Sequence, residues 1–285
     1  MPSPSFYRTL FLYCACALTL AVNAASQTFF IIGDTGDCDQ EGAALVGKAL
    51  RAQPDWQKTT LIETGDLAYP VATRERLIAC HEPHFYGFAR RLSVPGNHDW
   101  SDAGGLGFFA TFPGDMPRKE NLAGPWQLLM LNSNLRDEAA AQQLRWLDKT
   151  LAASRGECLI AAWHHPHWSS GKHGDNRFTA PLWERLHGKA TFTLHGHDHH
   201  FEALPALNRD GEPDKAGLSS FIVGHSGARL YEAGWGQARS QRAHYGQWGF
   251  MRLELDGRGY RWQAINTEGK VIDHGEGQCQ THAPR

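Results

Sequence analysis

Five short segments of the sequence carry polar side chains that could bind metal ions, four of them directly after a glycine. Seven of these side chains are carboxylate, phenol, amide or imidazole groups: Asp34, Asp66, Tyr69, Asn97, His164, His197 and His199. Such groups bind hard to borderline cations such as Fe, Mn, Zn and Mg. Two ions about 3.5–4 Å apart need one shared carboxylate and about three further ligands each, so the seven residues fit a two-metal centre.

Each of these segments follows a stretch that is typical of a β-strand. The runs end at GDTGD, GDLAY, GNHD, WHHP and GHDHH. Strands of an α/β sheet end at a common edge, so residues far apart in sequence can form one site there. Helical spacing over residues 40–53 and 137–154 separates some of the strands, and strand-like runs with glycine-containing turns follow Ser220. We therefore expect a single domain of mixed α/β type.

Each segment alone also fits a purely structural role. Asp34 could cap the helix that follows it, and Asn97 and Asp99 are residue types that favour turns. His164 and His165, which precede a proline, could form a polar loop. The order and spacing of all five segments together favour one shared metal centre over five independent loops.

The same ordered segments resemble the calcineurin-like metallophosphoesterase superfamily. GDxG, GDxxY, GNHD, His-x-Pro and GHxH occur in that order, and the tyrosine of GDLAY points to the purple acid phosphatase branch. The resemblance extends over roughly residues 28–275 and is greatest to the small, single-domain members. It implies a four-layer α/β/β/α sandwich, with two mixed sheets flanked by helices. It also implies hydrolysis of phosphomonoesters through attack by a metal-bound hydroxide.

The resemblance further assigns the ligands to two metal ions. The first ion would be held by Asp34, Asp66, Tyr69 and His199. The second ion would be held by Asp66, Asn97, His164 and His197, with Asp66 bridging the two. A tyrosinate ligand favours Fe(III), so the expected pair is Fe(III) with a divalent Fe, Zn or Mn ion. Tyr69 precedes Pro70, however, and could instead be an aromatic residue at the rim of the site.

Four further residues are candidates for substrate binding or proton transfer. The resemblance places His98 against the substrate phosphate, with Asp99 orienting its ring as a carboxylate partner. His173, in SSGKHG, lies where the family has a histidine that can protonate the leaving alcohol. A solvent-exposed loop histidine would fit the same position. His165 is adjacent to a predicted ligand and could contact the substrate.

Other polar residues near these segments have predicted structural roles. His195 is expected behind the ligands, and His81 at the surface or the rim of the site. His200 is expected either to face outwards or to pack on its loop. Asp198 is expected only to separate the two histidine ligands of GHDHH. Asn132 stands where the family often has Asp, which is expected to change hydrogen bonding around the ligands without changing the metal set.

The first 24 residues have the pattern of an export signal. Arg8 provides a positive charge, residues 10–22 form a short apolar run, and Val22-Asn23-Ala24 is a small-residue cleavage site. The apolar run is shorter than the roughly 20 residues that span a bilayer, so we expect no stable membrane insertion after cleavage. Residues 25–285 would then be one catalytic domain, periplasmic or secreted.

The cysteines fit an exported protein. Two of the six lie in the signal, at Cys14 and Cys16, and neither follows a good lipobox, which makes a lipoprotein a weak alternative. An even number in the mature chain favours disulfides over metal thiolates. Four cysteines allow three connectivities. The preferred pairs are Cys38 with Cys80 and Cys158 with Cys279.

The charge balance of the chain, with 28 basic and 30 acidic residues, gives no polybasic surface for nucleic acid. A small-molecule phosphoester is the expected partner, and the sequence indicates no oligomeric state. A phosphodiesterase or nucleotide hydrolase with the same metals is the closest alternative, because the sequence does not show the width of the pocket. A non-catalytic metal-binding protein on this fold is a third, which His98 and His173 disfavour.

Overall fold

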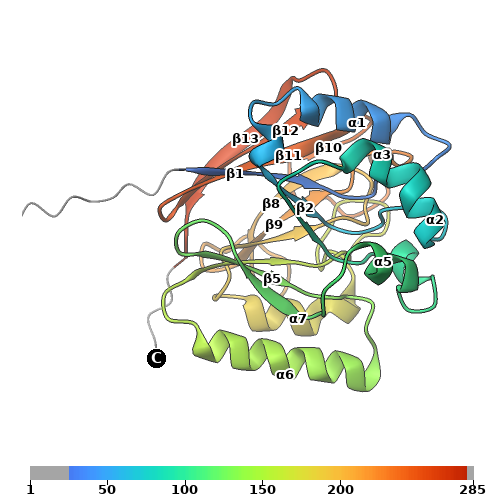
Figure 1. Ribbon diagram of the computed structural model, residues 1–285. Helices are drawn as coiled ribbons and strands as arrows, with labels where there is room; N and C mark the ends of the chain where they lie inside the picture. Colours follow the sequence, from blue (N-terminus) through green and yellow to red (C-terminus); the bar gives the residue numbers. More distant parts are fainter. Residues whose placement is uncertain (1–25, 281–285) are drawn as a thin grey trace, which may run out of the picture.

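The computed structural model describes residues 26–280 as two β-sheets packed face to face, with helices outside them (Figure 1). The first sheet, in spatial order, contains β13 (Val271–Gln278), β12 (Gly259–Asn266), β11 (Gly249–Asp256), β1 (Gln27–Ile32), β2 (Thr60–Glu63) and β3 (Arg90–Ser93). The second contains β10 (Ala243–His244), β8 (Phe201–Leu207), β9 (Leu218–Val223), β7 (Phe192–His195), β6 (Cys158–Ala162), β5 (Trp126–Met130) and β4 (Arg118–Asn121). The α-helices are α1 (Gly42–Arg51), α2 (Arg74–Arg76), α3 (Glu82–Phe85), α4 (Asn97–Trp100), α5 (Leu106–Thr111), α6 (Asp137–Ala153) and α7 (Ala180–Leu186).

Three apolar layers hold the sheets and helices together. Alternate residues of β1 point to opposite faces of the sheet, so Phe29 and Ile31 lie in the core between the two sheets. Phe30 and Ile32 lie on the other face, in the cluster that includes residues of α1. Leu147 of α6 packs on the outer face of the second sheet. Figure 1 shows α1 at the top and α6 at the bottom, so the predicted four-layer sandwich of two mixed sheets is confirmed.

Parallel strands in both sheets position the candidate site. β1, β2 and β3 run parallel in the first sheet, and β5, β6, β7 and β9 run parallel in the second. Antiparallel neighbours, such as β11 beside β1 and β8 beside β9, make both sheets mixed. The strands predicted before the five polar segments are all present as β1, β2, β3, β6 and β7.

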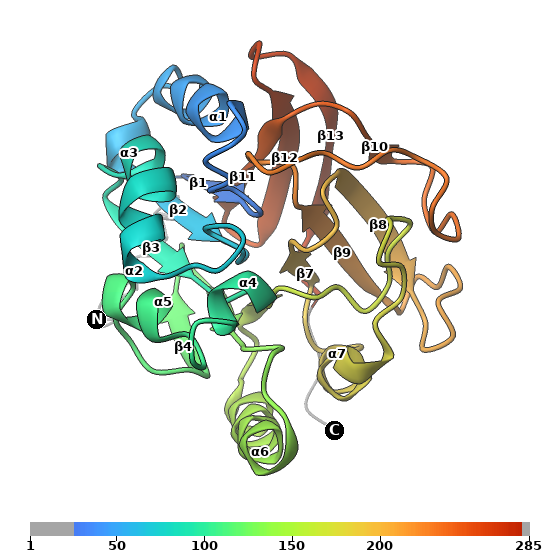
Figure 2. The ribbon, with the colours of Figure 1, turned by 90° about the vertical axis from the view of Figure 1, so that its right-hand side faces the viewer.

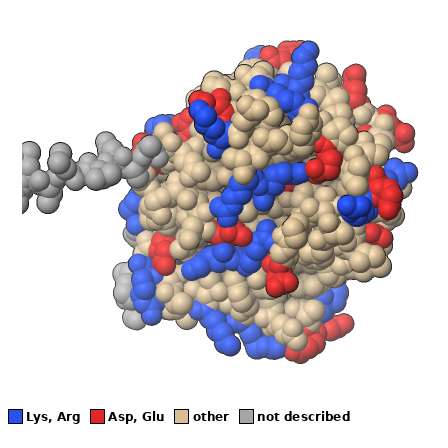
Figure 3. All heavy atoms as spheres, viewed as in Figure 1, with Lys and Arg blue, Asp and Glu red and all other residues tan. Residues whose placement is uncertain are grey.

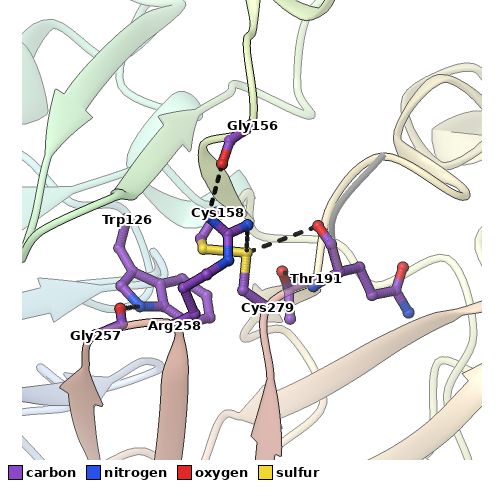
Figure 4. Close-up of a disulfide and its surroundings, with 8 residues drawn as sticks. Trp126, Gly156, Cys158, Thr191, Gly257, Arg258 and Cys279 are labelled. Atoms are coloured by element: carbon purple, nitrogen blue, oxygen red, sulfur yellow. Dashed lines mark hydrogen bonds between the residues drawn. A yellow bond between two sulfur atoms is a disulfide. The ribbon is translucent and has the colours of Figure 1, made fainter. Parts of the chain in front are cut away.

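Two disulfides confirm the preferred cysteine pairing. Cys38 is bonded to Cys80, and Cys158 is bonded to Cys279. Cys158 begins β6 in the second sheet and Cys279 directly follows β13 in the first, so this bond joins the two sheets covalently. Arg258 lies beside it and donates a hydrogen bond to the sulfur of Cys279 at 3.0 Å (Figure 4).

The surface carries charges of both signs. On the face viewed in Figure 3, Lys and Arg side chains are interspersed with Asp and Glu. Pairs such as Arg118 with Glu120, 3.0 Å apart, bring opposite charges into contact. Within residues 26–280, no helix is both long enough and apolar enough to cross a bilayer. The predicted signal peptide, residues 1–24, lies outside the described residues.

Candidate metal centre

The five polar segments meet at one edge of the two sheets. Asp34 follows β1, Asp66 follows β2, and Asn97 begins α4 after β3, all beside the first sheet. His164 and His197 follow β6 and β7 of the second sheet. Figure 2 looks onto this edge, with α4 near the middle of the view and the ends of β2 and β7 around it. The structure therefore brings predicted ligands from both sheets together.

Three of the predicted ligands surround the phenol oxygen of a fourth, Tyr69. Its Oη lies 3.0 Å from Asp34 Oδ1, 3.4 Å from Asp66 Oδ2 and 3.1 Å from His199 Nε2. The other ring nitrogen of His199, Nδ1, is bonded to the Arg229 carbonyl at 2.6 Å, which leaves Nε2 facing the group. This is the set predicted for the first ion, with donors close enough to share one cation.

A second group contains buried polar atoms that have no hydrogen-bond partner. These atoms are Asn97 Oδ1 and His164 Nε2. His164 Nε2 lies 3.1 Å from Asp66 Oδ2, and its Nδ1 is bonded to the Thr64 carbonyl at 2.9 Å. Buried polar atoms normally find partners, so two unpartnered ligand atoms beside a carboxylate fit a cation-binding position.

His197 faces this second group, but it also brings His165 close. The ring of His197 lies 5.1 Å from that of His164 and 4.4 Å from that of His165, measured between centroids. Ligand atoms of these three histidines lie within 4.8 Å of one another, as do those of Asp34, Asp66 and His164. His165 is therefore a competitor of Asn97 for the second ion, although the sequence suggested only a contact with substrate.

The backbone around these ligands adopts conformations that side chains rarely tolerate. Asp34, Asp66 and His197 have positive φ angles of 56°, 54° and 74°. Gly96 allows a close approach to the Asp66 side chain, since a Cβ there would lie 2.1 Å from Asp66 Oδ1. Residues with such φ angles typically cluster at functional sites, where the surrounding structure imposes the strain.

Burial and charge act in opposite directions on Asp66 and His164. Burial disfavours both charged forms, which alone would raise the pKa of the Asp66 carboxyl and lower that of the His164 imidazole. Their mutual attraction outweighs burial, so the pKa of Asp66 lies well below its ordinary value and that of His164 is raised to about 9. A cation must displace this proton from His164, so metal uptake releases protons and weakens as the pH falls.

Tyr69 is held in its neutral form while no cation is bound. Burial, reinforced by the charges of Asp34 and Asp66, holds the pKa of the phenol well above its usual range. The phenol therefore donates its hydrogen bond to Asp34. Only a cation of high charge bound at this position would lower the pKa of the phenol enough to favour the phenolate.

A family model described as calcineurin-like phosphoesterase matches residues 27–201, more than half of the chain. The matched stretch starts at β1 and contains all seven predicted ligands. The chain belongs to this family.

Curated relatives match a much shorter part of this phosphoesterase. Tartrate-resistant acid phosphatase type 5 of Rattus norvegicus is 36% identical over 74 residues, which are 25% of this chain and 23% of that protein. The protein of the same name from Mus musculus matches equally. The chain thus matches less than a quarter of the length of these relatives.

Solved structures share the fold over nearly the whole chain. GAP50, described as the anchor in the inner membrane complex of Plasmodium, has a TM-score of 0.72 at 16% identity and covers 90% of both chains. The purple acid phosphatase PPD1 from yellow lupin (Lupinus luteus) seeds has a TM-score of 0.69 at 19% identity, covering 89% of this chain and 54% of its own. At these identities the likeness shows the fold, which is the one that the sequence resemblance implied.

Asp99 of this phosphoesterase does not orient His98, so that prediction is wrong. Its Oδ2 accepts hydrogen bonds from the backbone N–H groups of Asp66 at 2.7 Å and Gly96 at 2.8 Å. Its Oδ1 accepts one from the N–H of Leu67 at 3.0 Å. The side chain is fully buried and ties the Asp66 loop to the start of α4. Asp99 therefore positions ligand backbones instead of handling protons.

His98 lies at the open side of the first group. Its ring packs on Tyr69 with centroids 4.4 Å apart, and its Nδ1 is bonded to the Pro70 carbonyl. This bond turns Nε2 toward the ligands, 4.0 Å from Asp66 Oδ2. The side chain is 34% exposed, so an incoming phosphate can reach it.

His173 also lies at the site, over the second group of ligands. Its ring lies 4.2 Å from that of His197, between centroids. Its Nε2 is bonded to the hydroxyl of Tyr231 at 3.1 Å. The backbone N–H of His173 donates to Asp198 Oδ1 at 2.8 Å, and Asp198 also accepts from the hydroxyl of Ser169. Asp198 is fully buried and fixes the His173 loop, so the prediction that it is only a spacer is wrong.

Tyr231 is a site residue that the sequence analysis missed. Its ring stacks on His199, with centroids 4.2 Å apart and planes within 10°. It therefore links a predicted metal ligand to His173. Tyr231 lies in a loop after β9 and belongs to none of the five segments, so residue type and spacing gave no signal for it.

Two other histidines lie near the predicted ligands in sequence. His200 is fully buried instead of facing outwards, with Nε2 at 3.3 Å from Glu202 Oε2 and its ring stacked on Tyr245. Of the two expected positions the outward-facing one is wrong, because Glu202 gives the ring an internal partner. His195 is buried, and its Nδ1 is bonded at 2.9 Å to the carbonyl of Trp163, the residue before His164. This is the expected position behind the ligands.

Asn132 supports the ligand loops indirectly. Its Oδ1 accepts hydrogen bonds from the backbone and the side-chain amide of Asn134, at 2.9 and 3.0 Å. The Asn134 amide in turn donates to the carbonyls of Pro95 and Gly96. Asn132 therefore acts on the segment that carries Asn97, in line with the expected change in hydrogen bonding around the ligands.

His81 is fully buried, so its prediction as a surface or rim residue is wrong. Its Nε2 lies 2.9 Å from Glu63 Oε1 and its Nδ1 lies 2.8 Å from Thr35 Oγ1. Arg91 donates to both oxygens of Glu63 at 2.7 and 3.1 Å. Burial alone would raise the pKa of Glu63, but Arg91 and His81 lower it from 4.5 to about 2. These buried charges are paired and hold the loop after β1 against the helical turn at residues 77–81.

Glu63 should stabilise the fold against acid. Because its folded-state pKa is depressed, its contribution is complete above pH 4.5 and is lost as the pH falls toward about 2. Glu63→Gln should remove this dependence, which corresponds to roughly 3 kcal/mol. Urea unfolding between these pH values measures it. Glu138→Gln, at the exposed start of α6, is the control, and equal acid sensitivity of wild type and Glu63→Gln would contradict the assignment.

Proposed function

We propose that this protein is an exported, binuclear metal-dependent phosphatase that hydrolyses phosphomonoesters. The observation that carries the proposal is the convergence of two ligand groups on Asp66. One group surrounds Tyr69 Oη within 3.4 Å, and the other presents the unpartnered atoms Asn97 Oδ1 and His164 Nε2. One carboxylate between two sets of donors is the arrangement that a two-metal hydrolase requires.

The residues present fit two cations of the predicted kind. Asp34, Asp66, Tyr69 and His199 would hold Fe(III). Asp66, Asn97, His164 and His197 would hold a divalent Fe, Zn or Mn ion. When bound, the ions supply Lewis acidity for the phosphoryl oxygens and activate water.

The protein's own residues bind the substrate and move protons. His98, partly exposed beside Tyr69, would hold a phosphoryl oxygen through Nε2. His173 would deliver a proton to the leaving oxygen, since its Nε2 already exchanges a hydrogen bond with Tyr231. His165 would contact the substrate phosphate on the side away from His98. The bond between its Nδ1 and the hydroxyl of Ser133 fixes the orientation of the ring. In this scheme Asp99 acts only through the backbone of the Asp66 loop.

Removing the phenol oxygen of Tyr69 tests the iron assignment. Protein purified without chelators should absorb visible light through tyrosinate-to-Fe(III) charge transfer, and Tyr69→Phe should abolish the band. Tyr231→Phe is a matched control, because this ring stacks on His199 without supplying a ligand, and it should keep the band. A colourless wild-type enzyme with full activity and no iron would overturn the assignment.

Substrate panels test the choice of phosphomonoesters. The purified protein should hydrolyse p-nitrophenyl phosphate with a higher kcat/KM than bis(p-nitrophenyl) phosphate across an acidic to neutral pH series. The reverse preference would make the protein a phosphodiesterase with the same metals. A chain that binds two ions and hydrolyses neither ester would be a non-catalytic protein on this fold.

Export and domain organisation complete the proposal. Residues 1–24 would be a cleaved signal peptide, and residues 25–285 would form one catalytic domain in the periplasm or outside the cell. Two disulfides support this location, since such bonds persist in oxidising compartments. Sequencing the N-terminus of protein recovered from the culture medium or periplasm tests it, and a start at Met1 would contradict it.

A further inference from the structure

A large aromatic side chain with no partner in the core stands beside the candidate site. Trp235 is 66% exposed, in the loop between β9 and β10. The ammonium of Lys172 lies 5.9 Å from its ring centroid and 4.9 Å from that of Tyr231. Lys172 directly precedes His173, so this aromatic and cationic surface adjoins the proposed proton donor.

Tyr231 connects this surface to the metal ligands. One face of its ring stacks on His199, and its hydroxyl is bonded to His173. The ring itself is half-buried, so Trp235 supplies most of the accessible aromatic area. Tyr231, Lys172 and Trp235 together are called the aromatic arm below.

The arm is held firmly against the loop that carries His173. A Cβ on Gly236 would lie 2.4 Å from the Gly171 carbonyl oxygen, so only glycine allows this backbone contact. Further along the same segment, the N–H of Arg239 donates to Ser170 Oγ at 2.7 Å, and the guanidinium of Arg239 pairs with Asp175. The backbone directly after Trp235 is therefore held close to the loop that carries His173.

We propose that the aromatic arm is a subsite for the leaving group and that it selects nucleoside diphosphates. The inference rests on the proposed function, because His173 marks the side of the leaving oxygen. The terminal phosphate of a nucleoside diphosphate is singly linked, like that of a phosphomonoester. The base stacks on the exposed ring of Trp235, and Lys172 neutralises the phosphate that stays with the nucleoside.

The reaction at this subsite is a hydrolysis and needs no further reactant. The oxygen of water forms a bond to the terminal phosphorus, and the bridging P–O bond breaks. Its electron pair leaves with the nucleoside monophosphate, whose new terminal oxygen takes a proton from His173. One proton of the water stays on the inorganic phosphate, and the other replaces the proton that His173 gave up. Stacking contributes to kcat/KM only of substrates whose leaving group carries a ring, and charge neutralisation only of those whose leaving group carries a second phosphate.

Ratios of kcat/KM test the subsite. Four probes differ in the leaving group. That of ADP carries a ring and a second phosphate, and that of AMP carries the ring alone. That of pyrophosphate is the second phosphate alone, and that of β-glycerophosphate has neither. Trp235→Ala should lower the ADP-to-pyrophosphate ratio by about 10-fold, the size expected for loss of one stacked base. Lys172→Gln should instead lower the ADP-to-AMP ratio.

Two control variants separate the arm from other aromatic surfaces. Tyr86, which directly follows α3 and is 60% exposed, has the guanidinium of Arg51 5.7 Å from its ring centroid and so pairs an aromatic ring with a cation in the same way. Tyr86→Ala should leave all ratios unchanged. Phe178, 45% exposed beside His165 and Arg136, is the competing stacking surface. Loss of the ADP preference in Phe178→Ala, with Trp235→Ala unaffected, would overturn the proposal.

The subsite and the proposed function fail in different ways. A wild-type enzyme that hydrolyses β-glycerophosphate and ADP with equal kcat/KM, insensitive to Trp235→Ala, would refute the subsite and leave the phosphatase intact. A protein that contains two metal ions and hydrolyses none of the four probes would refute the proposed function itself.

Discussion

Replacing Asp66 with asparagine should remove the bound metal and lower turnover of p-nitrophenyl phosphate on the order of 10³-fold. Asp66 Oδ2 lies 3.4 Å from Tyr69 Oη and 3.1 Å from His164 Nε2, so one carboxylate serves both ligand groups. Asparagine keeps the shape and can still accept the hydrogen bond from the N–H of His98, but it lacks the charge. Elemental analysis of the purified variant measures the loss.

A matched control for Asp66→Asn lies in the first ligand loop. Asp37 is near Asp34 in the chain, but its side chain only accepts a bond from the backbone N–H of Asp39. Asp37→Asn should therefore retain both ions and nearly full turnover. The bridging role would be refuted by an Asp66→Asn protein that keeps two ions per chain.

Adding one methyl group at Gly96 should disrupt the site almost as strongly. A Cβ there would lie 2.1 Å from Asp66 Oδ1 and 2.4 Å from the Asp66 backbone nitrogen, so the rigid loop must move. We expect Gly96→Ala to lose at least about 100-fold in turnover and to be destabilised by about 1–3 kcal/mol. Metal content, turnover and urea unfolding of the variant are the measurements.

Gly259→Ala is the control for this steric effect. Its Cβ would lie 3.2 Å from the end of the flexible Gln278 side chain and 3.3 Å from the Asp256 carbonyl oxygen, well beyond the contacts of 2.1 and 2.4 Å at Gly96, and Gly259 begins β12. That variant should keep its metals and its activity. If Gly96→Ala behaves like Gly259→Ala, the Asp66 loop is more adaptable than the contacts indicate.

The ligands could be predicted from the sequence because their chemistry is local to strand ends. Each predicted ligand follows a buried strand, and strand direction alone places Asp34, Asp66 and His164 at one edge. Apolar spacing identified α6, and the even number of cysteines indicated disulfides, whose preferred pairing the structure confirms. It did not identify β8, where Pro205 interrupts the pairing with β9 between Leu204 and Leu207.

Roles that depend on side-chain direction could not be predicted in this way. Asp99 follows His98 in the chain, yet its oxygens turn toward backbone N–H groups of another loop. His81 is buried because Glu63 and Arg91, from two different strands, provide its partners. Tyr231 reaches the site only through the path of a long loop. Such pairings follow from three-dimensional packing, which residue spacing does not encode.

The most direct test of the central claim is anomalous diffraction from crystals of the metal-loaded protein. Two peaks per chain are expected, on either side of Asp66. One should lie against Tyr69 Oη and show an iron edge, and the other should lie against Asn97 Oδ1 and His164 Nε2. A single ion, or a second ion bound through His165 with Asn97 left unbound, would contradict the proposed centre.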